Sequence, residues 1–281
     1  MLVESINCGS RRLGLAHFSA IDVAPADFIT LAAAAGFSAV GLRLNPAFPG
    51  APFYELKPGS AVANEVKRRL EGEGIEVYDI EFVVVGQDFQ PHALLPVLEA
   101  AANIGAKRVS VCGDDAETGR FTNNLAALSD LAAPLGLSID LENMGWRSVA
   151  IFQDSVRAIQ KVARPNACVL VDALHFYRNG GVTEDLAPAL DVVRSVQLCD
   201  IRGSRPATPE EMVKEARSGR FAPGEGELPL IDFVRAVSKV ATFSVEVPMA
   251  GGVEPGEHAS HLFAAAKRIL DLADQPSIVT R

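Results

Sequence analysis

The sequence predicts a (β/α)₈ barrel, and three observations point to this fold. Four glycines recur at intervals of 38, 31 and 31 residues, and each lies between a helix-like segment and a short apolar run. Eight such runs alternate with helix-like segments, and each run is short enough to be a strand buried on both faces. Eight strand–helix units in about 250 residues match the size of this barrel. A doubly wound open sheet has the same alternation and is the structural alternative.

The recurring glycines, Gly36, Gly74, Gly105 and Gly136, define the element boundaries. Glycine adopts the left-handed conformation that ends a helix without a Cβ penalty, so we expect a helix to end at each of them. Pro25 favours the first turn of a helix over 25–35. The expected strands are 11–17 (RRLGLAH), 37–44 (FSAVGLRL), 75–82 (IEVYDIEF), 106–113 (AKRVSVCG), 137–143 (LSIDLEN), 167–172 (ACVLVD), 194–199 (RSVQLC) and 241–246 (ATFSVE). Further helix-like segments are 91–104, 150–164, 183–191, 228–240 and 256–273.

Two connections are long, 44–57 after the second strand and 200–227 after the seventh. Long connections in compact domains are commonly lids or binding loops, and both follow the carboxyl ends of strands, where barrel enzymes carry their chemistry. We see no linker, and we expect one domain over 1–281 with its core at about 11–274.

Composition excludes some function classes. The 281 residues are 48% hydrophobic and 22% charged, with a net charge of −9. A nucleic-acid partner needs a basic face, so this acidic balance argues against one. The longest weakly polar stretch, 29–42, is too short to span a membrane. Glu4 and Arg11–Arg12 stand where a signal peptide needs an apolar run, so we expect a cytoplasmic protein.

The four cysteines, Cys8, Cys112, Cys168 and Cys199, have no CxxC spacing and lie mostly inside apolar runs. Buried, reduced thiols are the expected state. The sequence also has no GxGxxG after a strand, no GxxxxGK[ST] and no GxSxG, so dinucleotide, P-loop and serine-hydrolase functions have no support.

Oxygen-bearing side chains stand at the ends of four consecutive expected strands. They are Glu142, Asp172, Gln197 and Glu246. In a barrel these ends meet in one mouth, where three carboxylates at close range cost several kcal/mol unless a cation neutralises them. A divalent metal ion explains the arrangement better than four independent structural roles.

These residues resemble a known family. Glu142, the Asp172-x-x-His175 pair, Gln197, Glu246 and the segment PGEGELPL (223–230) are similar to the xylose-isomerase-like TIM-barrel superfamily, which includes sugar phosphate isomerases and epimerases. The resemblance implies metal ligands at Glu142, Asp172, Gln197 and Glu246. It extends from the first strand to the eighth, and one metal scaffold in this group serves several reactions.

The residue at 197 bears on both the metal and the reaction. Many epimerases of the family have histidine where this chain has Gln197, whose amide oxygen makes the site all-oxygen and favours Mn²⁺ or Mg²⁺, with Co²⁺ or Zn²⁺ as alternatives. Some 3-dehydroshikimate dehydratases of the superfamily resemble this chain in using glutamine there. The related three-zinc endonucleases need more histidines than the five present, and their DNA substrate conflicts with the acidic charge.

The expected mechanism is proton transfer next to a carbonyl. With a hydroxy-ketone bound to the metal, Glu142 and Glu246 approach from two sides, one removing a C–H proton and the other returning it through a metal-bound enediolate. We therefore expect a metal-dependent isomerase or epimerase acting on a small sugar, sugar phosphate or polyol-derived ketone. The first alternative is a lyase of the 3-dehydroshikimate dehydratase type, with the loop arginines holding a ring carboxylate. The second is a non-catalytic barrel that binds a sugar or a partner.

Several other residues are candidates for substrate binding. The resemblance assigns this role to His175, which can equally be a core histidine with satisfied hydrogen bonds. Trp146 can pack against sugar C–H groups or be a core residue. Glu81, His17 and the loop arginines Arg202 and Arg205 are further candidates, with surface or structural roles as the alternative. No surface patch identifies an oligomer interface, so a homo-oligomer is left open.

Overall fold

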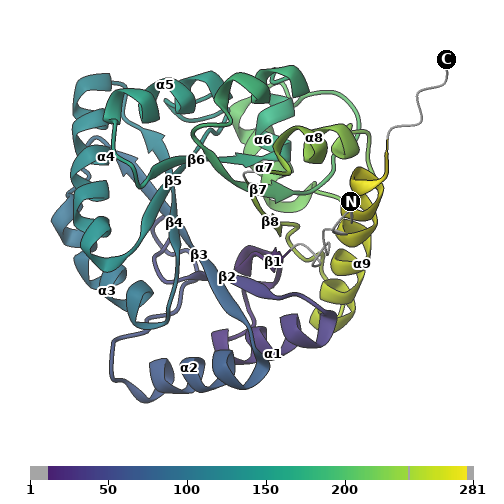
Figure 1. Cartoon of the computed structure of the whole chain (residues 1–281), viewed down its shortest axis with the longest axis horizontal. Helices are drawn as coiled ribbons and strands as arrows, with labels where there is room; N and C mark the ends of the chain where they lie inside the picture. The colour runs from purple at the N-terminus through teal and green to yellow at the C-terminus, as the bar shows by residue number, and fades with distance from the viewer. Residues whose placement is uncertain (1–11, 240, 277–281) are drawn as a thin grey trace, which may run out of the picture.

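The computed structural model of the chain describes residues 12–239 and 241–276. Eight parallel strands form a closed barrel in the order β1 to β8, and the helices surround it (Figure 1). Because β1 pairs with β8 as well as with β2, the sheet has no free edge, which confirms the predicted barrel and rejects the open sheet. The strands are β1 (Leu13–Leu15), β2 (Ala39–Arg43), β3 (Glu76–Gly86), β4 (Arg108–Asp114), β5 (Ser138–Glu142), β6 (Ala167–Asp172), β7 (Val193–Leu198) and β8 (Thr242–Val245).

The recurring glycines have the expected conformation. Gly36, Gly74, Gly105 and Gly136 all have positive φ, at 104°, 66°, 77° and 73°. Gly36 and Gly74 end helices directly, and the chain then enters a strand. The helices are α1 (Pro25–Ala35), α2 (Ala61–Glu73), α3 (Leu95–Asn103), α4 (Thr118–Ala132), α5 (Phe152–Val162), α6 (Ala173–Arg178), α7 (Pro209–Ser218), α8 (Leu230–Val237) and α9 (Pro255–Asp274).

Strand register brings the polar strand ends to one level. Arg43 pairs with Glu81, and Asp172 pairs with Gln197. Gln197 in turn pairs with Ser244, two residues before Glu246. An irregularity in β3 between Ile80 and Val83 shifts its pairing with β4. The carboxyl ends of the strands therefore form one polar rim, as the parallel arrangement requires.

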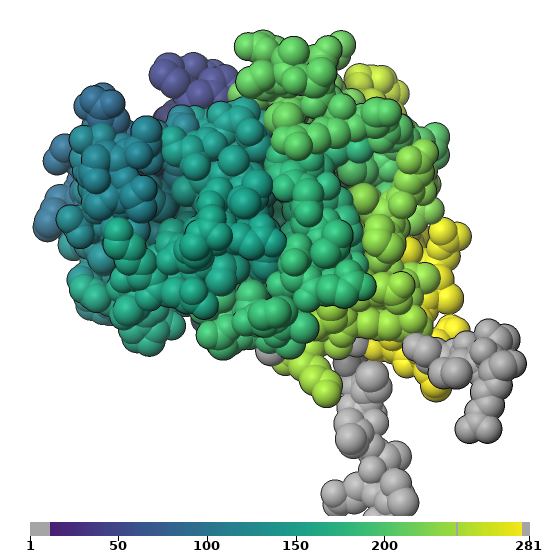
Figure 2. Space-filling model, turned by 90° about the horizontal axis from the view of Figure 1, so that it is seen from above, coloured from purple at the N-terminus to yellow at the C-terminus, as the bar shows by residue number. Residues whose placement is uncertain are grey.

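The two long connections rise from this same end of the molecule. The purple segment that includes 44–57 and the green segment around α7 project together at the top of Figure 2. The guanidinium of Arg217 in α7 lies 4.4 Å from the ring centroid of Phe48 in the first connection. Helix α7 was not expected inside 200–227. Its signal is Thr208, whose side chain accepts a hydrogen bond from the Glu211 N–H, followed by proline at the first helical position.

No helix in the described ranges combines the length and the apolar character needed to cross a membrane. Cys112, Cys168 and Cys199 are buried and free of disulfides, as predicted. Cys8 lies outside the described residues.

A buried ion pair lies inside the barrel, below the rim. Asp140, which is 1% exposed, accepts hydrogen bonds from Arg108 at 3.0 and 3.1 Å and also from the Ser195 hydroxyl. Asp140 precedes Glu142 by two positions on β5, so its side chain points inward one layer deeper than that of Glu142. The ion pair with Arg108 explains how Asp140 can be buried although it lies outside the polar rim.

We expect the Asp140→Ala variant to lose about 3 kcal/mol of unfolding free energy, because it leaves the mostly buried Arg108 guanidinium without its counter-charge. Urea unfolding followed by circular dichroism measures the loss. The matched control is Asp130→Ala, whose ion pair with Arg164 is solvent-exposed and is expected to contribute little. Equal stability of the two variants would contradict this role for Asp140.

Candidate functional site

A cleft opens at the carboxyl ends of the strands, with about 840 Å³ of empty space that includes its open mouth. The lining includes the polar residues Glu142, His175, Gln197, Arg220 and Glu246, here called the floor, and the apolar residues Phe18, Phe48, Phe82, Met144 and Trp146.

Glu142, Asp172 and His175 form a compact group of ligand-type side chains. One candidate ligand atom from each of the three lies within 4.8 Å of the others, and all three residues are buried. Glu142 ends β5 and Asp172 ends β6. Asp172 is also the N-cap of α6, where its Oδ1 accepts a hydrogen bond of 3.0 Å from the His175 N–H. This hydrogen bond to the His175 backbone fixes the Asp172 side chain locally, because an N-cap carboxylate reaches the third residue of its helix.

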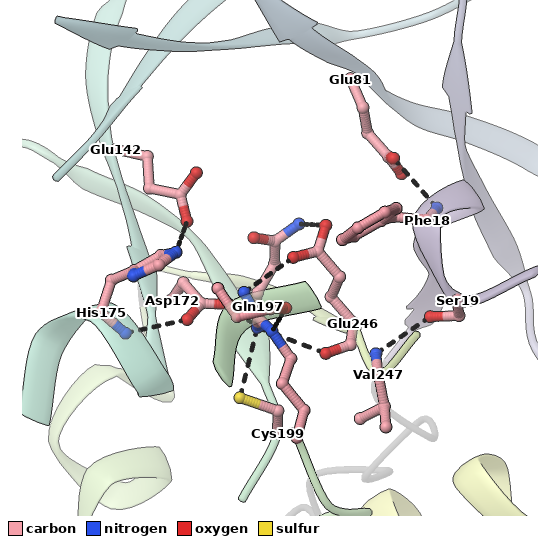
Figure 3. A network of polar contacts seen from close by, with 12 residues as sticks. Phe18, Ser19, Glu81, Glu142, Asp172, His175, Gln197, Cys199, Glu246 and Val247 are labelled. Atoms are coloured by element: carbon pink, nitrogen blue, oxygen red, sulfur yellow. Dashed lines mark hydrogen bonds and ion pairs between the residues drawn. The ribbon is translucent and has the colours of Figure 1, made fainter. Parts of the chain in front are cut away.

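Gln197 and Glu246 complete the floor from the two following strands. The Gln197 amide nitrogen lies 3.5 Å from Glu246 Oε1. Figure 3 shows these two side chains directed toward the group formed by Glu142, Asp172 and His175. Of the four strand-end residues expected to be metal ligands, two thus lie in the group with His175, and the other two contact each other on the neighbouring strands.

Arg220 holds two of these carboxylates. Its Nη1 lies 2.5 Å from Asp172 Oδ2 and its Nη2 lies 3.1 Å from Glu246 Oε2, and the Arg220 side chain is only 2% exposed. Its Nε donates to the carbonyl of Ala216 at 3.0 Å. Arg220 is one of four arginines in the connection 200–227, and nothing in the local sequence separates it from the other three.

Burial has the largest effect on the pKa values of the titratable side chains at the cleft floor. It raises the pKa of Glu142 well above its usual value, and the charges of Asp172 and Glu246 raise it further. Burial also raises the pKa of Glu246 to about 7, although Arg220 opposes the shift. For Asp172 burial acts in the same direction, but the charge of Arg220 and the hydrogen bonds it receives lower its pKa overall. Burial lowers the pKa of His175 to about 4, so its imidazole is neutral at pH 7.

The donor set fits a divalent cation. Glu142 Oε1 is buried and has no hydrogen-bond partner among the described residues. Such an atom costs free energy unless a cation or a donor reaches it. Carboxylate oxygens, an amide oxygen and a neutral imidazole are suitable ligands for Mn²⁺, Mg²⁺, Co²⁺ or Zn²⁺. Glu142, Asp172 and His175 lie close enough together to hold such an ion, and Gln197 and Glu246 lie beside each other on the two following strands.

Glu81 lies in the cleft lining, but its oxygens already have partners. They accept hydrogen bonds from the backbone N–H groups of His17 and Phe18, at 2.6 and 3.1 Å, and from Arg43 at 3.2 Å. The bond to Phe18 is drawn in Figure 3. Glu81 therefore joins β3 to the segment after β1, and any contact it makes with substrate is additional to this role.

Trp146 and His17, which were also predicted to bind substrate, lie in different places relative to the cleft. Trp146 lines the cleft and contacts His175 edge-on, with ring centroids 5.1 Å apart. His17 is buried between Phe28 and Tyr54, outside the lining, where its Nε2 lies 2.9 Å from the Val23 carbonyl oxygen. Burial lowers the pKa of His17.

The arginines that the structure brings to the cleft are not those singled out from the sequence. Arg202 and Arg205 are exposed and lie outside the lining; Arg202 stacks on Phe221 and Arg205 contacts Asn179. Besides Arg220, the lining includes Arg43, Arg147 and Arg217. Position in the fold, not sequence spacing, determines which arginine reaches the cleft.

Comparison with known proteins gives a match at the family level. The sequence profile described as xylose isomerase-like TIM barrel matches residues 29–269. No curated protein sequence is significantly similar to this chain.

Solved structures share the fold at low sequence identity. A protein named IOLI with a bound zinc atom superposes with a TM-score of 0.76 at 16% identity, covering 94% of this chain and all of the other. The probable 3-DHS dehydratase AsbF from Bacillus anthracis gives 0.74 at 12%, covering 91% and 98% of the two chains. D-psicose 3-epimerase in the presence of D-fructose gives 0.69 at 12%, covering 94% and 100%. A fusion of a xylose isomerase-like TIM barrel with a 4-hydroxyphenylpyruvate dioxygenase gives 0.75 at 18%, where 92% of this chain spans only 42% of the fusion protein.

Proposed function

Because the chain belongs to the family of xylose isomerase-like TIM barrels, we propose that it is a divalent-metal-dependent isomerase or epimerase. Its substrate would be a small sugar, sugar phosphate or polyol-derived ketone. The observation that carries this proposal is that Glu142, from the end of β5, and Glu246, at the end of β8, line one cleft, where Glu142 forms a cluster of ligand-type side chains with Asp172 and His175.

Glu142 and Glu246 would perform the proton transfers. When bound, a divalent ion polarises the carbonyl group of a substrate and makes the neighbouring C–H bond more acidic. The two carboxylates come from different sides of the cleft floor, so one can remove this proton and the other can return it. Return to the same carbon from the other side inverts its configuration, and return to the adjacent carbon interconverts aldose and ketose.

The other residues would bind and orient the substrate. Arg220 pairs with Asp172 and Glu246, lowers the pKa of Asp172, and opposes the rise in the Glu246 pKa that burial causes. Trp146 and Phe18 offer apolar surface to the C–H groups of a sugar ring. The neutral His175 imidazole lies 3.9 Å from Glu142, close enough to share a substrate hydroxyl with it.

Hydrogen exchange in D₂O tests this function. The purified protein is loaded with Mn²⁺ and incubated with fructose, ribulose 5-phosphate or a cyclic polyol ketone, and the loss of C–H signals is followed by NMR. Exchange at the carbon beside the carbonyl, with formation of an epimer or an aldose, supports the proposal. A protein that binds these compounds without exchange or reaction would instead act as a binding protein.

A second candidate function is dehydration, as in a 3-dehydroshikimate dehydratase. It is favoured by the four arginines in the cleft lining, Arg43, Arg147, Arg217 and Arg220, which suit a substrate with a carboxylate. It is also favoured by the oxygen donor at Gln197. The first step is the same proton removal, followed by loss of a hydroxyl group β to the carbonyl. Absorbance of the conjugated product distinguishes this reaction from isomerisation.

His175 provides a prediction that separates metal binding from turnover. We expect His175→Ala to bind Mn²⁺ with nearly wild-type affinity, because four other ligands remain, and to lower turnover by about 10²-fold through loss of a group near the reacting atoms. Calorimetric Mn²⁺ titration and the exchange assay measure the two effects. Loss of Mn²⁺ from this variant would make His175 a ligand in its own right.

A further inference from the structure

The segment after β7 brings Arg220 into the site but is anchored from outside it. Asp200, two residues beyond β7, is fully buried and does not belong to the cleft lining. Its carboxylate accepts three backbone hydrogen bonds. Oδ1 accepts from Ile201 at 2.9 Å and from Leu228 at 3.0 Å, and Oδ2 accepts from Gly224 at 2.9 Å. One side chain therefore joins the beginning of the segment to its end.

The backbone of Asp200 makes a second connection. It forms an isolated antiparallel bridge with Phe221, in which each residue donates to the other, at 2.8 and 2.9 Å. Phe221 directly follows Arg220 in the chain. The position of the Arg220 backbone is thus set by Asp200, while its guanidinium reaches Asp172 and Glu246.

The turn that closes around Asp200 leaves no room for another side chain. A Cβ atom at Gly226 would lie 2.3 Å from Asp200 Oδ1 and 2.3 Å from the Ile201 carbonyl oxygen. Such distances require the backbone or the carboxylate to shift. Glycine at 226 is therefore a condition for the three hydrogen bonds of the Asp200 carboxylate.

From these contacts we infer that Asp200 is a positioning residue, which fixes the Arg220 guanidinium between Asp172 and Glu246. This inference rests on the proposed function, since it concerns the same site. Asp200 touches neither the candidate metal ligands nor the cleft. It acts only through the backbone at Phe221 and the turn at Gly224–Leu228, so the effect of changing it should depend on whether Arg220 is present.

A double-mutant cycle tests this dependence. Wild type, Asp200→Asn, Arg220→Gln and the double variant are titrated with Mn²⁺ by calorimetry, and their stabilities are measured by urea unfolding. Asparagine keeps the shape of the side chain but presents an NH₂ group to the Gly224 N–H. We expect Arg220→Gln to lower the Mn²⁺ dissociation constant, because the ion then neutralises the carboxylates alone. Asp200→Asn should lower it by at least about threefold when Arg220 is present, and should change it little once Arg220 is replaced.

Two further variants serve as a substitute for Asp200→Asn and as its control. Gly226→Ala disturbs the same turn without altering charge, and it should reproduce the dependence on Arg220 if Asp200→Asn does not fold. The control is Asp115→Asn, a buried acid that accepts from the Glu117 N–H at 2.9 Å in the turn after β4. Its effect should be the same with and without Arg220.

The outcomes separate this inference from the proposed function. Equal effects of Asp200→Asn in both backgrounds would overturn the positioning role and leave the metal site intact. A wild-type protein that binds no Mn²⁺ would overturn the proposed function. The urea cycle then decides the inference alone: a smaller stability loss from Asp200→Asn in the Arg220→Gln background supports it, and additive losses refute it.

Discussion

Replacing Glu142 by glutamine is expected to lower the rate of C–H exchange by about 10²–10⁴-fold, the usual contribution of a general acid or base. Glutamine is neutral and nearly isosteric, so the variant keeps the packing of a residue that is 4% exposed but cannot accept a proton. It also removes one negative ligand, and Mn²⁺ affinity should fall with it. The exchange assay in D₂O and calorimetric titration measure the two effects on one protein preparation.

Glu225→Gln is the matched control for this substitution. Glu225 pairs with His261 on the surface, outside the cleft lining, so its replacement should leave exchange and Mn²⁺ binding unchanged. Glu246→Gln is expected to resemble Glu142→Gln, because the two carboxylates share the proton transfer. Full exchange activity with full Mn²⁺ occupancy in Glu142→Gln would refute its roles as ligand and as base.

The barrel was predictable because its signals are local. A glycine that ends a helix is required by backbone conformation alone, and Gly36, Gly74, Gly105 and Gly136 all have the positive φ that this requires. Eight such units can bury their strands only in a closed or open parallel sheet. The pairing of β1 with β8 then decides between these two, and no local pattern in the sequence contains that long-range contact.

The strand-end residues could also be found from sequence, because they follow directly from the ends of apolar runs. The structure brings Glu142 and Asp172 together with His175 and places Gln197 next to Glu246, and the role of the four strand-end residues as metal ligands stays a proposal. Arg220 could not be singled out, since it is placed by contacts between distant segments: the bridge from Asp200 to Phe221 and the ion pairs with two different strands. Arg202 and Arg205 belong to the same segment but lie outside the cleft lining, because contacts between distant segments, not the local sequence, determine where each arginine lies.

The charges in the floor also depend on tertiary structure. On the sequence alone, three carboxylates close together at the mouth of the barrel require a cation, and the expected cation is a metal ion. The structure adds a guanidinium that neutralises part of this charge by itself. Glu142 is the carboxylate that Arg220 does not contact, and it is also the one with a buried oxygen lacking a partner among the described residues. The need for a metal ion is therefore greatest at Glu142.

Replacing Arg220 by methionine is expected to lower the unfolding free energy by about 3–5 kcal/mol, because Asp172 and Glu246 would stay buried without their counter-charge. Methionine keeps most of the side-chain volume, so lost packing contributes little. Urea unfolding after dialysis against EDTA measures the loss. Arg164→Met serves as the control, because its ion pair with Asp130 is exposed and should contribute little to stability.

Adding Mn²⁺ should then stabilise Arg220→Met more than it stabilises wild type, since the ion takes over the neutralisation of Asp172 and Glu246. Equal stabilisation of both proteins would mean that the guanidinium and the metal act on different carboxylates. A stability loss no larger than that of Arg164→Met would mean that Asp172 and Glu246 do not carry charge together in the folded protein. The variant thus tests whether the carboxylates that the barrel gathers are ionised together, which a metal site at these strand ends requires.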